Sequence, residues 1–209
     1  AHLVLNLALT SVRSRRQRHQ HMELLRLLSS PLPDVPSTRV IDHPAPAAYC
    51  LPGARSVTVL SEGMIALLSP EELDAVIAHE RTHLRQKHHL LLDAFRSWKR
   101  ALPWFPIATR AQDAVALLLE MLADDTARRS SGDPVLAGAI RIVDETGTAG
   151  SPPGAPKDRR TPEQRRDALL AREARLTAGR RTVGPALRLT IAVVTVLLVV
   201  VPPVLVLTS

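Results

Sequence analysis

The sequence predicts a mainly α fold with a small β element, followed by a C-terminal transmembrane helix. Residues 71–102 and 108–129 contain no Gly or Pro and have helical composition, which favours two long helices. Short segments rich in β-branched residues precede them and indicate a few strands. Residues 187–207 are almost wholly apolar, and 19 residues of helix span about 28 Å, close to the thickness of a bilayer core.

The N-terminal region combines an apolar stretch with a basic one. Residues 1–12 are mostly apolar and stop at the arginine cluster of residues 13–18. A signal peptide has its charges before the apolar run, so we expect residues 1–12 to be the end of a truncated membrane helix. Residues 16–29 contain four leucines at helical spacing and predict a short amphipathic helix.

Strands are expected in the Pro-rich region that follows. Residues 31–53 are irregular, with short extended pieces at 38–41 and 47–51. Residues 56–60 form a β-branched run that predicts a strand. Because this strand lies just before the first long helix, we expect it to be a sheet edge on which an extended peptide can pair.

The first long helix has a clear start. Ser69-Pro70-Glu71-Glu72 is a capping box with proline at the first helical position. We expect an unbroken helix from there to Leu102, before Pro103.

That helix carries the most informative motif of the chain, His79-Glu80-Arg81-Thr82-His83. Residues four apart share one face of a helix, so the two imidazoles can bind one zinc ion. Glu80 is then placed to act as a general base. Zinc lowers the pKa of a bound water and polarises a substrate carbonyl, so the motif predicts peptide hydrolysis.

The second long helix supplies the remaining acids. Glu120 completes a His, His, Glu set and leaves the fourth position of zinc open. Asp124 lies one turn later and is expected to accept the second ring N–H of a histidine ligand. On an unbroken helix His88 points about 140° away from His83, and His89 about 120° away on the other side, so neither is expected at the same ion.

This set resembles the gluzincin pattern of integral-membrane zinc peptidases. It most resembles the BlaR/MecR-like antirepressor peptidases in a short form without a penicillin-binding sensor domain, since residues 48–53, 57–59 and 68–73 occur in the same order and the chain has no S-x-x-K motif. The CAAX-protease and HtpX-like membrane peptidases are similar in the pattern of their zinc ligands. The resemblance implies an α+β minigluzincin core, zinc bound by His79, His83 and Glu120, Glu80 as catalytic base, and Asp124 as the partner of a ligand.

Composition and charge indicate where the protein is located and what it contacts. The net charge is +7, aromatic residues are 2%, and there is one cysteine, so an intramolecular disulfide is excluded. Cys50 is expected to be a small core residue. Basic clusters flank both apolar segments, and the positive-inside rule places the zinc domain on the cytoplasmic face of a bacterial cell membrane. No aromatic residues are interleaved with the arginines, so we expect contact with membrane lipids and no nucleic acid.

The expected organisation has five parts: the membrane-helix end at 1–12, a zinc metallopeptidase domain at 13–143, a flexible Pro/Gly linker at 144–160, a basic helix at 161–186 and the transmembrane helix at 187–207. The sequence predicts a membrane-anchored zinc endopeptidase that cuts a protein or peptide substrate in the cytoplasm or near the membrane. One alternative is a catalytically idle membrane scaffold that keeps the zinc fold. Another is a basic DNA- or lipid-binding regulator in which the motif is accidental.

Overall fold

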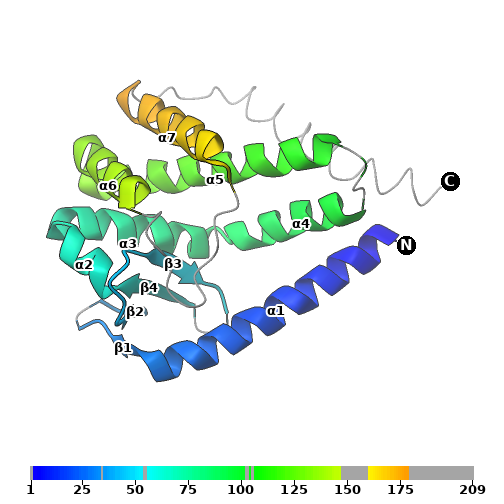
Figure 1. The fold of residues 1–209 in the computed structure, drawn as a ribbon, viewed down its shortest axis with the longest axis horizontal. Coiled ribbons are helices and arrows are strands. Elements are labelled where there is room, and N and C mark those ends of the chain that lie inside the picture. The colour runs from blue at the N-terminus through cyan, green and yellow to red at the C-terminus, as the bar shows by residue number, and fades with distance from the viewer. Residues whose placement is uncertain are drawn as a thin grey trace.

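The structure is a computed structural model that describes residues 2–33, 35–53, 56–101, 104, 106–146 and 160–178. Over these residues the chain is mainly helical with one small four-stranded sheet, which confirms the expected class (Figure 1). The described elements are α1 (His2–Leu28), β1 (Ser29–Pro31), β2 (Thr38–Ile41), β3 (Ala48–Leu51), β4 (Val57–Ser61), α2 (Glu62–Leu67), α3 (Pro70–Arg85), α4 (His88–Ala101), α5 (Pro106–Ser131), α6 (Asp133–Thr146) and α7 (Pro162–Thr177).

The sheet has the strand order β1-β2-β4-β3. Strand β4 pairs in parallel with β2 on one side and antiparallel with β3 on the other. The expectation that residues 56–60 form an edge strand is therefore wrong. Val59 and Leu60 are fully buried, as in a central strand covered on both faces. The edge beside α3 is β3, which pairs through Leu51 with Val57 and through Ala48 with Leu60.

Helix α1 is longer than expected. Residues 16–29 were expected to form a separate short helix, but one helix runs from His2 to Leu28. No Gly or Pro interrupts this run, and its leucines and arginines are good helix formers, so the basic cluster does not end the helix. Helix α1 lies along α4 (Figure 1), and Ser14 and Arg18 both contact the buried carboxylate of Asp93 there.

The first long helix is broken, contrary to expectation. Helix α3 starts at its Ser69 capping box but ends at Arg85, and α4 begins at His88. The break is centred on Lys87, whose φ of 53° lies in the left-handed region that few residues other than glycine adopt. No Gly or Pro occurs at this position, so the local sequence does not predict the break.

Helix α3 lies between the sheet and the helices α5 and α6 (Figure 1). It packs on β3 on one side and on α5 and α6 on the other, and α7 covers α5 and α6. The Thr161 capping box that starts α7 is present. Helix α6 continues to Thr146, so the first three residues of the expected linker are helical.

Membrane crossing is the part of the expected fold that the described residues do not contain. Among them, no helix is both long enough and apolar enough to cross a bilayer. The predicted transmembrane helix at 187–207 lies outside the described residues, as does most of the linker at 144–160.

Candidate metal centre

Two packed helices build the site. Helix α3 carries His79 and His83 one turn apart, and the second helix, α5, carries Glu120 and Asp124 one turn apart. The contact between α3 and α5 brings the two pairs together, because each pair lies on the face that its helix turns toward the other.

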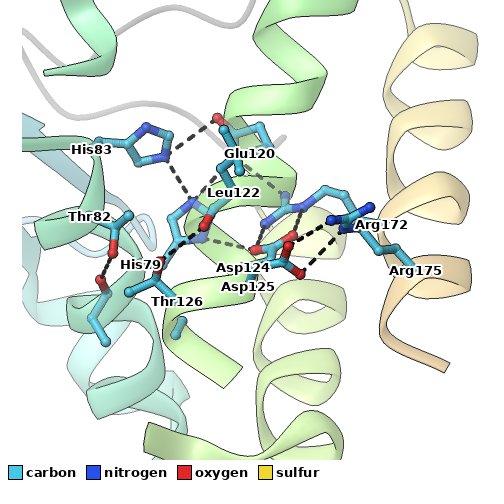
Figure 2. A network of polar contacts seen from close by, with 12 residues as sticks. His79, Thr82, His83, Glu120, Leu122, Asp124, Asp125, Thr126, Arg172 and Arg175 are labelled. Carbon is cyan, nitrogen blue, oxygen red and sulfur yellow. Dashed lines mark hydrogen bonds and ion pairs between the residues drawn. The ribbon is translucent and has the colours of Figure 1, made fainter. Parts of the chain in front are cut away.

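Three candidate ligands converge on one point, as Figure 2 shows. The Nε2 atoms of His79 and His83 are 3.1 Å apart. Glu120 places Oε2 at 3.3 Å from the first and Oε1 at 3.7 Å from the second. One ligand atom from each of the three residues lies within 4.8 Å of the others. These atoms can therefore surround a single small cation.

The outer nitrogen of His79 faces a second acid. Its Nδ1 lies 2.9 Å from Asp124 Oδ1, at hydrogen-bonding distance although not in the alignment of a good hydrogen bond. Asp124 in turn accepts two hydrogen bonds of 2.7 Å from Arg172, which comes from α7 (Figure 2). The third guanidinium nitrogen of Arg172 is 3.7 Å from Oε2 of Glu120. A row of alternating charges thus runs from α7 to the centre of the site.

The pKa values of the charged groups in this row depend on their neighbours. Burial works against the charged form of His79, but its contacts with Asp124 and Glu120 outweigh burial and raise the pKa to about 10. Burial also opposes ionisation of Glu120, yet His79 and Arg172 hold its pKa below the ordinary value. Burial lowers the pKa of His83 to about 4, so this ring is neutral and free to bind a metal.

Glu80 lies beside the convergent atoms and is half-buried. Burial raises its pKa, with Glu120 adding to the effect and His79 opposing it. A raised pKa suits a group that must take up and release a proton near neutral pH. Burial and the neighbouring Glu80 carboxylate raise the pKa of the Cys50 thiol on strand β3. Cys50 was expected to be a core residue, but it is only half-buried and contacts the site.

His88 also reaches the site, although the sequence excluded it. Its Nδ1 is 2.8 Å from Nδ1 of His83, and its Nε2 is 2.9 Å from Oε1 of Gln86. The expectation assumed an unbroken helix, and the break at Lys87 removes that assumption. Among the described residues, no hydrogen bond or ion pair joins His89 to the three candidate ligands.

Comparison with known proteins identifies the family. A model of peptidase family M48 matches residues 12–122, which is more than half of the chain. The chain belongs to peptidase family M48. No curated protein matches it, and no solved structure does either. Members of this family are typically zinc-dependent metallopeptidases. The match includes the three candidate ligands His79, His83 and Glu120, and it ends before Asp124.

The residues of this M48 peptidase fit zinc. Two imidazole nitrogens and one carboxylate are a donor set that zinc uses in catalytic sites, where a fourth position stays open. Each histidine turns Nε2 inward and Nδ1 toward a partner, which is how ligand histidines are usually held. The site is thus shaped for a metal by its donors and by the groups behind them.

Besides Cys50, two contributors to the M48 site were not expected from the sequence. Arg172 was read as one of many basic residues near the membrane, and His88 was excluded by its helical angle. Arg172 lies 48 residues beyond Asp124, past the matched region, and only the packing of α7 on α5 brings it in. The capping box at Thr161 signalled that a helix was present, but not where it packs.

Proposed function

We propose that this M48 peptidase is a zinc-dependent endopeptidase that hydrolyses peptide bonds of a cytoplasmic or membrane-proximal protein. The observation that carries the proposal is the convergence of His79, His83 and Glu120 within 4.8 Å, with Glu80 next to them on the same helix. A scaffold that only needed a structural zinc would have no use for a half-buried carboxylate with a raised pKa beside an open position.

Each residue then has a defined task. His79, His83 and Glu120 hold the metal, and Asp124 keeps the ring of His79 in place. When bound, zinc supplies a Lewis acid that polarises the scissile carbonyl and makes water easier to deprotonate. Glu80 accepts the proton of the attacking water and delivers it to the leaving amine.

The edge strand β3 supports an extended peptide as the substrate. Among the described strands, β3 pairs with β4 alone, so its other side has backbone groups that an added strand can use. Tyr49 and Leu51 are buried against the core, while Cys50 faces Glu80. A peptide lying along β3 would therefore run past the general base, which favours cleavage within a chain.

The membrane setting rests on the sequence. The basic clusters and the apolar residues 187–207 support an anchored enzyme whose zinc domain faces the cytoplasm of a bacterium. The resemblance of residues 48–73 to BlaR/MecR-like peptidases supports a regulatory protein as the substrate. Fractionation of cells tests the anchor, because the full chain should sediment with membranes and a chain ending at residue 186 should do so less.

Zinc content and turnover test the chemistry. We expect about one zinc per chain in detergent-purified protein and a clear loss in Glu120→Ala. Glu80→Gln should keep zinc but lose cleavage of an unfolded protein by at least about 100-fold, since it removes the general base. Glu71→Gln, exposed on the same helix, is the matched control and should keep both.

The outcomes separate the alternatives. Zinc bound with equal turnover in Glu80→Gln and the wild type would remove this mechanism. Zinc bound without turnover in any variant would favour the idle scaffold. No zinc in the wild type would favour the regulator with an accidental motif.

A further inference from the structure

His83 has a buried histidine behind it. His88 is 4% exposed, and its Nδ1 lies 2.8 Å from Nδ1 of His83. The two rings meet edge to face, with centroids 4.8 Å apart and an interplanar angle of 85°. On its far side, Nε2 of His88 is 2.9 Å from the amide oxygen of Gln86. Every ring nitrogen of this pair therefore faces a defined neighbour.

The hydrogen-bond partners of His88 determine which ring nitrogens of His88 and His83 carry a hydrogen. The amide oxygen of Gln86 can only accept, so Nε2 of His88 must carry the hydrogen. A neutral His88 then has a bare Nδ1, which accepts from Nδ1–H of His83. With its hydrogen on Nδ1, His83 has a bare Nε2 lone pair, and that is the atom that faces His79 and Glu120. The two hydrogen bonds from His83 to His88 and from His88 to Gln86 thus select the Nδ1–H tautomer of His83, which leaves its Nε2 free for a metal.

The helix break makes this contact possible. On an unbroken helix His88 would point about 140° away from His83. The left-handed conformation of Lys87, with φ 53°, redirects the chain, and α4 starts at His88 itself. Such a conformation is unfavourable for a residue with a side chain, and strained positions of this kind gather at functional sites.

We propose that His88 is a positioning residue that holds the His83 ring in its metal-binding tautomer and orientation through the Nδ1–Nδ1 hydrogen bond. The proposal deepens the proposed function and rests on it, because it assigns a role toward the same zinc. It parallels the arrangement at His79, where Asp124 stands behind the ligand. The two histidines would each be held from the side that faces away from the metal.

Zinc affinity of the detergent-solubilised chain of residues 1–209 tests the role of His88. Competition with a chromogenic chelator measures the dissociation constant for zinc alone, without any substrate. We expect His88→Leu to bind zinc roughly 10- to 100-fold more weakly, the usual effect of losing a group behind a ligand. The neighbour His89, which has no contact with His83, gives the control His89→Leu, and this should bind as the wild type does.

A pair of amide variants makes the test specific to geometry. Asparagine carries its amide oxygen where Nδ1 of histidine lies, so His88→Asn should restore most of the affinity. Glutamine places its amide near the position of Nε2, so His88→Gln should stay weak although it is equally polar. The visible absorption of the Co²⁺-loaded protein should follow the same order, since it reports the ligand geometry directly.

Each result has a clear meaning. If the wild type binds zinc and His88→Leu binds it equally well, the role of His88 is overturned and the proposed function stands. If the wild type binds no zinc, the proposed function fails, and this inference with it. If His88→Leu does not fold, as judged by circular dichroism without metal, the amide pair decides: equal zinc affinity of His88→Asn and His88→Gln overturns the proposal.

Discussion

Replacing Arg172 by glutamine tests whether α7 is part of the metal centre or only a cover. Arg172 makes two hydrogen bonds of 2.7 Å to Asp124. The Asp124 side chain is 2% exposed and that of Arg172 is 17% exposed, so the pair is largely shielded from water. One turn later Arg175 makes a similar pair with Asp125, but those side chains are 45% and 27% exposed.

The two pairs differ in expected free energy. Removing one partner of a buried ion pair leaves a buried charge without its partner and costs about 3–5 kcal/mol of stability. His79 remains 2.9 Å from Asp124 and still compensates part of the charge, so we expect about 3 kcal/mol for Arg172→Gln. Solvent screens the other pair, so Arg175→Gln should cost less than about 1 kcal/mol. Denaturant unfolding followed by circular dichroism, with metal removed, measures both.

The comparison can also fail in a defined way. Equal losses for Arg172→Gln and Arg175→Gln would show that α7 stabilises the fold only by covering it. A double-mutant cycle with Asp124→Asn sharpens the result, because a pair in contact should show a coupling free energy of about 1–3 kcal/mol. A coupling near zero would refute the assignment of Arg172 to the site.

Two further predictions concern the backbone and a buried phenol. Lys87 has φ 53°, so Lys87→Gly should leave stability unchanged or raise it, and Lys87→Ile should be less stable than Lys87→Gly by about 1–2 kcal/mol; thermal unfolding measures both, and an Ile variant as stable as the Gly variant would contradict the strained break. Burial raises the pKa of Tyr49 to about 12 from an ordinary value of about 10. The folded state then keeps its proton where the unfolded state loses it, so this contribution to stability is complete below pH about 10 and falls as the pH rises toward 12. Tyr49 is the one tyrosine of the sequence, so phenolate absorbance reports it directly, and ionisation at pH about 10 in the folded protein would contradict the prediction.

Local signals in the sequence were enough to predict the start of α3, the presence of α5 and the inner residues of the candidate site. The Ser69 capping box begins α3 as predicted, because a cap depends on residues within one turn. The spacings of His79 with His83, and of Glu120 with Asp124, place each pair on one helical face whatever the rest of the chain does. The strand at 38–41 was predicted with its observed bounds for the same reason: its signal is local.

Tertiary structure decided the features that depend on residues far apart in the chain. Strand β4 is internal because β2 and β3 both pair with it, and no property of residues 56–60 reveals its neighbours. Arg172 reaches Asp124 only through the packing of α7, 48 residues away. No Gly or Pro occurs at the break at Lys87, so the sequence does not predict it. This break brings His88 to His83. The sequence by itself therefore determined which groups are the candidate metal ligands, since helical periodicity is a local property. Packing of the helices determined which groups lie behind those ligands. Packing depends on many weak contacts between residues far apart in the chain, so local sequence does not predict it.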